Sequence, residues 1–196
     1  MILWENVAYL VDDDRRFAVF EMLRKRVGLS PRAILSAPHE LLLEIARSGG
    51  MHPEHRVERL RDIARMTLDE HGGDLRTVLK LPLPKARAAL GRYPGIGGPG
   101  AEKVLLFCGG PPLLALESNG LRVLLRLGYG EEKVNYSATY RSVQEAAATE
   151  MGTSRDQLAA AHLLLRRHGQ DLCKRSDPRC EECPLSPACR FYQNLF

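Results

Sequence analysis

Aromatic residues, alternating strand-like runs and long apolar stretches are all scarce in this sequence of 196 residues. Phe, Trp and Tyr together make up 6% of the chain, and it contains no low-complexity segment or solenoid-type repeat. The apolar start MILWENVAYL carries no basic segment and runs directly into Asp12, Asp13 and Asp14. A secretory leader needs that basic segment, and a membrane span needs about 20 apolar residues. The sequence therefore predicts neither of these, and no membrane partner.

Cysteine is rare outside one short segment, which holds four of the five cysteines. This clustering favours metal binding in a reducing compartment over a disulfide framework, so we expect an intracellular protein. The net charge of +4 permits a polyanionic partner but does not require one. The length suits one sizeable domain or two small ones.

Helical periodicity dominates the rest of the chain. In 54–70, for example, Val57, Leu60 and Ala64 recur at the spacing of one helix face. Further helices are expected over 38–47, 84–92, 101–107, 118–127, 137–151 and 155–168. Ser154 followed by Gln157 is typical of a capping box at the start of the last of these. We therefore predict an all-α fold.

Four cysteines in the last quarter of the chain are separated by six, two and five residues: Cys173, Cys180, Cys183 and Cys189. Gaps this short allow several thiolates to converge on one metal centre, and thiolate ligands suit zinc or an iron–sulfur cluster. Pro184 and Pro187 stiffen the segment, and little sequence around it can form a packed core. We therefore expect the bound metal to hold this segment folded.

A glycine-rich turn lies between two predicted helices at 93–104, YPGIGGPGAEKV. Glycine tolerates positive φ and lets another molecule approach the backbone closely. Together with the partial positive charge at the start of the next helix, exposed N–H groups here can bind a phosphate. A plain interhelical turn is the alternative. The order Pro-Gly-apolar-Gly between apolar helices favours the hairpin of a DNA-binding helix-hairpin-helix element.

Three stretches of this chain resemble the endonuclease III family, the iron–sulfur branch of the helix-hairpin-helix DNA glycosylases. Pro94-Gly95-Ile96-Gly97 is similar to the family's L-P-G-V-G hairpin. His168-Gly169 followed by Cys173 is similar to its H-G-x-x-x-C motif, and the cysteine spacing matches its [4Fe–4S] spacing. The segment 116–127 also resembles the one that follows the family's hairpin. The resemblance extends from about residue 2 to residue 191.

The resemblance implies two helical domains with a DNA-binding cleft between them. A six-helix barrel that contains the hairpin is expected over 1–115, and a domain that ends in the cluster loop 173–189 is expected over 116–196. The four cysteines are then the ligands of a [4Fe–4S] cluster, which in the family orders a basic loop and takes no part in bond cleavage. The resemblance also implies a monovalent cation at the hairpin.

The implied partner is double-stranded DNA with a damaged or mismatched base, which the protein bends and from which it extrudes that base. The hairpin residues expected to contact phosphate are Gly95, Ile96, Gly97, Gly98 and Gly100. The protein is then expected to be a cytoplasmic, nucleoid-associated monomer.

The hairpin departs from the family at the position of a catalytic lysine. Bifunctional members have L-P-G-V-G-R-K-T-A, and this alignment places Pro99 at the lysine position. A lysine there attacks the sugar C1′ and forms the Schiff base that permits strand cleavage. Lys103 lies one turn further on, about 6 Å along the helix axis, where solvent or phosphate contact is expected instead. We therefore predict no β-lyase activity.

A second departure concerns the catalytic carboxylate. The family has an aspartate in V-D-T-H or L-D-G-N, and here Glu117 takes that place in 116–119 (LESN). Glutamate keeps the charge but moves the carboxylate by roughly 1.5 Å. Two roles fit Glu117: the active carboxylate of a glycosylase with a rearranged pocket, or a cap for the helix that follows.

Two other segments have candidate roles near DNA. Asp12, Asp13 and Asp14 lie where the family has a polar run whose glutamine fills the gap left by the extruded base. They fit a solvated helix end paired with Arg15 and Arg16, or an acid–base group acting on the flipped base. Met51 lies near the family's apolar wedge, so it is expected either to enter the base stack or to belong to the core.

Two functions follow from the match and its departures. The first is a monofunctional DNA glycosylase, one that releases a base without cutting the strand, with altered base specificity. The second is a non-catalytic protein that binds lesions or DNA structures on the same scaffold. A zinc-stapled binding protein is a third hypothesis, which metal analysis separates from the other two.

Overall fold

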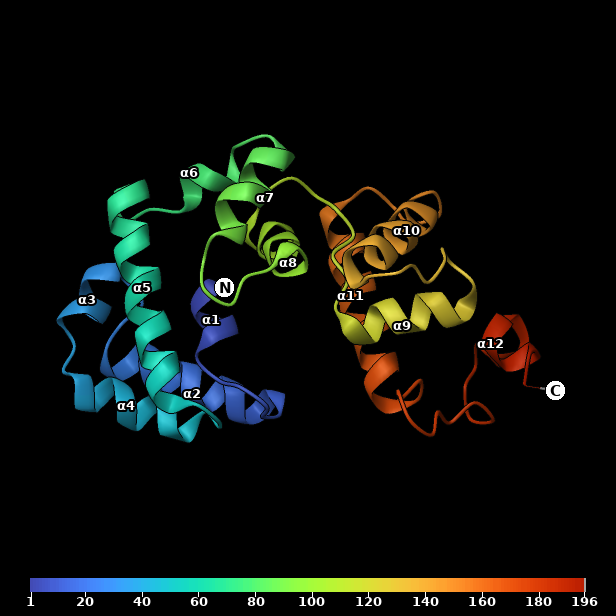
Figure 1. Cartoon of the computed structure of the whole chain (residues 1–196), viewed down its shortest axis with the longest axis horizontal. Coiled ribbons are helices and arrows are strands. Elements are labelled where there is room, and N and C mark those ends of the chain that lie inside the picture. The colour runs from blue at the N-terminus through green and yellow to red at the C-terminus, as the bar shows by residue number, and fades with distance from the viewer. Residues whose placement is uncertain (196) are drawn as a thin grey trace. The chain divides into compact units, whose positions relative to one another are not determined.

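The computed structural model describes residues 1–195, and this part of the chain contains helices, turns and loops but no strand. The predicted all-α fold is therefore confirmed. The chain divides into two compact units, Met1–Val104 and Leu105–Phe196, which are drawn together in Figure 1. This division falls within a helix, whereas the sequence places the domain boundary at 115/116. Among the described residues, no helix combines the length and apolar character that a membrane span requires.

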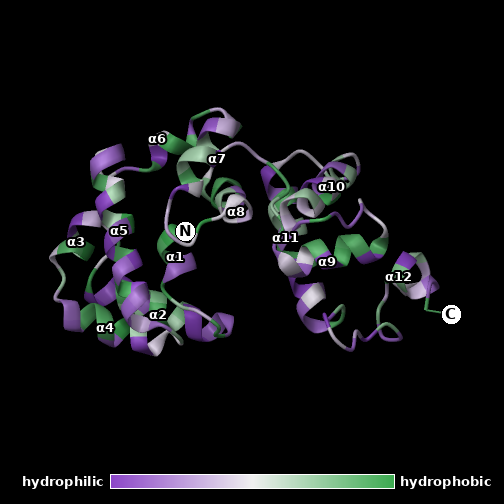
Figure 2. Cartoon of the chain, viewed as in Figure 1, coloured by the Kyte–Doolittle hydropathy of each residue, from purple (hydrophilic) through white to green (hydrophobic). Residues whose placement is uncertain are grey.

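The first unit begins with short α1 and then α2, neither of which the sequence analysis predicted. Its helices are α1 (Ile2–Asn6), α2 (Asp13–Arg26), α3 (Pro31–Ser36), α4 (His39–Ser48), α5 (Pro53–His71), α6 (Arg76–Leu79), α7 (Leu83–Gly91) and α8 (Gly98–Cys108), whose last residues belong to the second unit. The long helix α5 packs against α3 and α4. The predicted helices over 38–47 and 54–70 correspond to α4 and α5. Figure 2 shows apolar residues on several of these helices.

A buried arginine ties three segments of the first unit together. Arg56 of α5 is 2% exposed, and its guanidinium donates hydrogen bonds to the carbonyl oxygens of Val7 (2.6 Å), Ala46 (2.5 Å), Gly50 (2.8 Å) and Met51 (2.8 Å). These bonds satisfy the carbonyls of Val7, Gly50 and Met51, while Ala46 O also accepts from the Gly49 amide. The loop 49–52 is thereby fixed beside the end of α1.

The second unit packs its helices around an apolar core that includes Leu106, Leu116, Leu124 and Val143. Its elements are α9 (Ser118–Leu127), α10 (Tyr136–Ala148), α11 (Arg155–Asp171), the 3-10 helix η1 (Ser186–Ala188) and α12 (Arg190–Gln193). A close approach of α11 to α9 requires glycine, because a Cβ on Gly169 would lie 2.7 Å from the Cβ of Asn119.

The start of α11 caps two helices at once. Ser154 accepts a hydrogen bond from the Gln157 amide, and its hydroxyl contacts the Gln157 side chain, so the predicted cap at Ser154 is confirmed. The neighbouring Arg155 donates to the carbonyls of Leu105 (3.2 Å), Leu106 (2.8 Å) and Gly110 (2.5 Å). Arginine satisfies the orphan carbonyls at a helix end in this way. The last turn of α8 and the turn after it are therefore held by α11 within the second unit.

Candidate functional site

The glycine-rich hairpin is held in a fixed shape by the beginning of the chain. Asn6 of α1 is buried and donates through its side-chain amide to Pro94 O at 3.0 Å and to Ile2 O at 3.1 Å. Gly95 has φ +72°, and the Ile96 amide donates to Tyr93 O at 3.0 Å. The turn therefore has a defined conformation that a hydrogen bond from α1 stabilises, and it is not a flexible linker between helices.

Helix α8 starts inside the expected hairpin, at Gly98. Gly97 and Gly98 are exposed, and the first amides of a helix have no partner within the helix, so they are available to an anion. Pro99 occupies the first turn, where proline is tolerated, and it removes one donor from that turn. Ile96 is 4% exposed, and its amide already donates to Tyr93 O, so this residue supports the turn from beneath and is not itself open to a phosphate.

Replacing Gly95 with alanine is expected to disrupt this hairpin. The new Cβ would lie 2.6 Å from Oδ1 of Asn6, and the backbone would be strained because φ is positive. The free energy of unfolding should fall by about 1–3 kcal/mol in urea titrations, and duplex DNA affinity should fall with it. Gly97→Ala is the matched control, since a Cβ there meets no atom within 4 Å. Equal stability of the two variants would contradict the role assigned to Asn6.

The amine of Lys103 is not free to act as a nucleophile. Its ammonium forms an ion pair with Glu5 of α1 at 2.7 Å, and the two side chains are 23% and 18% exposed. This pairing is a structural role that the sequence analysis did not predict. Because Pro99 has no amine, neither hairpin position offers a free lysine.

Met51 projects from the loop that Arg56 fixes. Its side chain is 52% exposed, so a core role is excluded. The neighbouring His52 has φ +56°, and Leu10, on the loop after α1, has φ +55° and is 70% exposed. The Tyr9 amide donates to Gly49 O at 2.9 Å, which joins the two loops. Strained backbone of this kind concentrates at functional sites. No local sequence pattern marks Leu10, because its backbone conformation depends on this pairing of the two loops.

The three aspartates mark the start of α2. Asp12 caps the helix, and its carboxylate accepts a hydrogen bond from the Arg15 amide at 2.8 Å. The side chains of Arg15 and Arg16 donate hydrogen bonds to the carbonyls of Ser48 and Trp4. Carboxylates at the start of a helix are stabilised by its dipole. Capping of α2 therefore accounts for Asp12 without an acid–base role.

Glu117 caps the start of α9. One carboxylate oxygen accepts a hydrogen bond from the Gly120 amide at 2.8 Å, and the other accepts one from the Asn119 side chain at 2.9 Å. Glu117 is half-buried. Burial, and after it the negative charge of Glu117, raises the pKa of Tyr136 at the start of α10. The capping role of Glu117 is therefore present, and its carboxylate lies beside a tyrosine.

A chain of hydrogen bonds connects Glu117 to the cysteine-rich loop. Asn119, which donates to Glu117, accepts a bond from Arg122 at 2.8 Å. Arg122 also donates to Gly169 O at 2.8 Å and, through Nε, to Cys173 O at 2.9 Å. Movement of the loop would therefore displace Arg122 and, through Asn119, the carboxylate.

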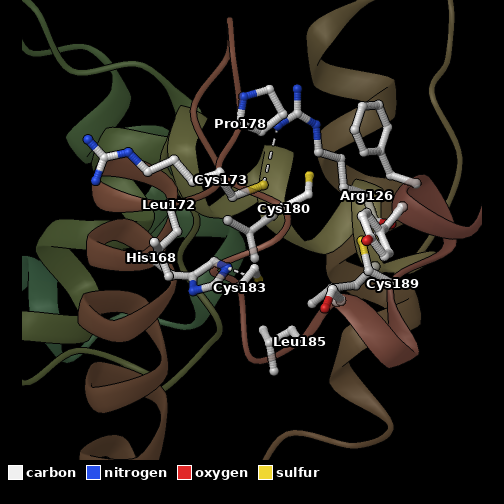
Figure 3. A pocket seen from close by; sticks show the side chains of 15 residues that line it. Arg126, His168, Leu172, Cys173, Pro178, Cys180, Cys183, Leu185 and Cys189 are labelled. Atoms are coloured by element: carbon white, nitrogen blue, oxygen red, sulfur yellow. Dashed lines mark hydrogen bonds between the residues drawn. The ribbon is translucent and has the colours of Figure 1, made fainter. Parts of the chain in front are cut away.

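The four predicted cysteine ligands line one pocket in the second unit (Figure 3). All four are free thiols. Burial, followed by the charges of Cys173 and Cys189, raises the pKa of the Cys180 thiol. Leu172, Pro178, Leu185 and Phe191 add an apolar lining.

Four cysteine thiolates are a donor set that suits either of two metal centres. Within residues 1–195, no three His, Cys, Asp or Glu side chains converge closely enough to hold one ion. Four thiolates around a single zinc would lie roughly 3.8 Å from one another. A cluster has several irons, each bound by its own thiolate, and so needs a wider arrangement around a central space. The residues present fit either centre by their chemistry, and iron, sulfide and zinc analysis separates the two.

Arginine and histidine donors surround the sulfurs. Arg126 of α9 donates to Cys173 Sγ at 3.3 Å and to Lys174 O at 2.7 Å, and its guanidinium lies 4.5 Å from the centre of the Phe191 ring. Nε2 of His168 lies 3.5 Å from Cys183 Sγ. Hydrogen bonds to ligand sulfurs tune and stabilise a metal centre. Neither Arg122 nor Arg126 was singled out from the sequence.

The curated relatives of this chain include DNA glycosylases. No family model matches the chain. It is 29% identical over 161 residues to "Endonuclease III" of Bacillus subtilis, a match that covers 82% of this chain and 66% of that protein. It is 26% identical over 181 residues to "Endonuclease III" of Sulfolobus acidocaldarius, covering 92% and 76%. It is 26% identical over 163 residues to "Thymine/uracil-DNA glycosylase" of Methanothermobacter thermautotrophicus, covering 82% and 67%.

Solved structures share the fold. A trapped endonuclease III–DNA covalent intermediate superposes with a TM-score of 0.77 at 21% identity, over 99% of this chain and 84% of that one. A thermostable thymine-DNA glycosylase superposes with a TM-score of 0.77 at 20% identity, over 98% and 83%. The sequence matches, the shared all-α fold and the hairpin together show that the chain belongs to the endonuclease III family of helix-hairpin-helix DNA glycosylases.

Proposed function

We propose that this protein is a monofunctional DNA glycosylase that releases a damaged or mismatched base from duplex DNA without cutting the strand. The observation that carries the proposal is the hairpin. It keeps the supported turn suited to phosphate, but has Pro99 in its first helical turn and Lys103 paired with Glu5. This combination supports DNA binding without an amine nucleophile.

The chemistry assigned to Glu117 is electrostatic. When the bond between base and sugar breaks, positive charge develops on the sugar, and a fixed carboxylate stabilises it. A water molecule then attacks C1′, Glu117 accepts its proton, and the departing base takes up a proton from solvent. The bonds from the Gly120 amide and Asn119 hold the carboxylate in one orientation before the reaction. Such preorganisation avoids the cost of reorienting the group during catalysis.

Other residues have binding roles in this proposal. The amides of Gly97, Gly98 and Gly100 bind phosphate, with Gly95 and Ile96 shaping the turn and a monovalent cation bound beside it. Met51 enters the space vacated by the extruded base. The thiolates of Cys173, Cys180, Cys183 and Cys189 hold a [4Fe–4S] cluster, which orders the loop and takes no part in bond cleavage. The protein acts as a monomer in the cytoplasm, at the nucleoid.

A panel of duplexes tests the substrate. Each duplex carries one altered pair, with thymine and uracil opposite guanine included because relatives bear those names. We expect release from at least one duplex under single-turnover conditions, with strand breaks appearing only after alkali treatment. Strand cleavage without alkali would refute the monofunctional assignment. The sequence-based expectation of altered specificity is measured in the same experiment, against an endonuclease III relative.

Borohydride trapping tests the missing nucleophile. Incubation with duplex DNA that contains an abasic site, in the presence of borohydride, is expected to give no covalent protein–DNA band. A lysine-bearing relative is the positive control. A trapped band that disappears in Lys103→Ala would show that this lysine leaves Glu5 and reacts with the sugar.

One observation favours the alternative, a lesion or structure binder without catalysis. Both carboxylate oxygens of Glu117 already accept hydrogen bonds within the protein, so capping alone accounts for the residue. Tight binding to a lesion duplex, with no release from any member of the panel, would establish this alternative.

A further inference from the structure

A second basin in the second unit lies outside the cysteine cavity. It has a volume of about 1570 Å³ measured out to its open mouth. The face of α9 that carries Leu121 and Leu125 lines it, together with the segment 130–136, and Arg175 and Arg190 contribute from the far end of the chain. The glycosylase chemistry proposed above assigns no role to most of this surface.

The segment before α10 presents an apolar side chain in a rigid setting. Val134 is 103% exposed. The Glu131 amide donates to Ser142 Oγ at 3.0 Å, and the Lys133 amide donates to Thr139 Oγ1 at 2.9 Å. After Val134, the Ala138 amide donates to the Asn135 side chain at 2.9 Å. A single exposed apolar residue is ordinary, but one whose neighbours on both sides are held by hydrogen bonds loses little entropy on contacting a partner. Val134 is therefore prepared for an apolar contact.

Positive charge predominates on the basin. The lining includes four arginines and one lysine, and a single carboxylate from Glu132. Lys133 is paired with Glu131, and Arg126 is used by the cysteine loop. Arg175 and Arg190 are exposed, and their side chains form no hydrogen bond or ion pair with the described residues. The basin thus combines an apolar floor with two unpaired cations.

This composition fits a protein segment better than nucleic acid. Single strands bind by stacking successive bases on open aromatic faces. The lining offers Tyr136, which is 49% exposed, and Phe191, one face of which Arg126 already covers. Tyrosine is equally common at protein interfaces. A phosphate backbone would also leave Leu125 and Val134 without partners. Apolar anchors flanked by arginine are typical of protein interfaces, where charge complementarity sets the choice of partner.

We propose that this basin binds an acidic segment of a partner protein. A large apolar side chain of that segment packs between Val134 and the face of α9, and carboxylates on either side pair with Arg175 and Arg190. This function is separate from base release, because none of these three residues has a role in the glycosylase mechanism proposed above.

Selection from a displayed random-peptide library tests the proposal, using the full chain loaded with its metal. The variant with both Arg175→Glu and Arg190→Glu serves for counter-selection. We expect enriched peptides that carry carboxylates around a large apolar residue. A fluorescein-labelled peptide of that sequence should bind about tenfold more weakly to Arg190→Glu and to Val134→Asp. Arg32→Glu, an exposed arginine in the first unit, should leave its affinity unchanged.

Two outcomes would overturn the proposal. One is the absence of any acidic peptide enriched over the counter-selected variant. The other is binding of labelled oligothymidylate or duplex DNA that Arg175→Glu and Arg190→Glu weaken and Val134→Asp does not, which would identify a nucleic-acid surface. Thermal unfolding of each variant checks that it folds. Base release by Val134→Asp should equal that of the unmodified protein, so this test and the test of the glycosylase fail independently.

Discussion

Glu117→Gln is expected to lower the rate of base release roughly 100- to 1,000-fold while leaving duplex affinity unchanged. Glutamine keeps an oxygen that can accept the hydrogen bond from the Gly120 amide, so the start of α9 remains capped. It removes the negative charge that would stabilise the sugar cation, and its NH2 group replaces the oxygen that accepts the hydrogen bond from Asn119. Single-turnover release from the best duplex of the panel measures the effect, and a binding titration on the same duplex measures affinity.

Two further variants separate chemistry from capping. Glu117→Asp keeps the charge and supplies a favourable cap, so it should fold normally and retain part of the activity. Glu117→Ala loses both functions and should also lose about 1 kcal/mol of stability. If Glu117→Gln released the base at the original rate, the residue would be a helix cap only, and the mechanism would need another group.

Loss of a cysteine ligand is expected to have the largest effect on the second unit. Cys183→Ser should remove the iron and the brown colour of the proposed cluster, and expose the segment after α11 to proteolysis, because the hydrogen bonds from Arg122 and Arg126 would then order the loop alone. Iron and sulfide analysis, the visible spectrum and limited proteolysis follow these changes. Cys108→Ser is the matched control, since Cys108 is exposed and lies outside the cavity.

The same variant tests the hydrogen-bond chain from the loop to Glu117. Once the loop is released, Cys173 O no longer holds Arg122, and the orientation of Asn119 is lost with it. Base release should therefore fall even where residual DNA binding is saturated. A preparation made without oxygen that contains one zinc per chain, and no iron, would contradict the cluster assignment.

The fold was largely accessible from the sequence, with errors that have physical causes. The periodic segments 38–47 and 54–70 correspond to α4 and α5 because each has one apolar face. Helix α2 escaped notice because charged residues fill its ends and only Val19 and Leu23 are buried. Helix α8 begins earlier than expected, at Gly98, because a proline in the first turn continues a helix where one further along would stop it.

In the candidate site, residues marked by a local sequence pattern were predicted, and residues with distant partners were not. The spacing of the four cysteines was enough to predict that they lie near one another, because short gaps limit where the thiols can lie. The roles of Arg122 and Arg126 were hidden, since their partners are 47 to 51 residues away, and many of those partners are backbone carbonyls, which any residue supplies. Likewise, the pairing of Lys103 with Glu5 spans 98 residues and has no local pattern.

The support that Asn6 gives to Pro94 has a consequence for synthesis. These two residues are 88 positions apart, so their hydrogen bond cannot form until nearly all of the first unit has left the ribosome. A nascent chain that stops short of Pro94 has α1 but nothing for Asn6 to hold. Conversely, a shortened protein lacking its first six residues would carry every glycine of the turn and still lack the shape that receives a phosphate.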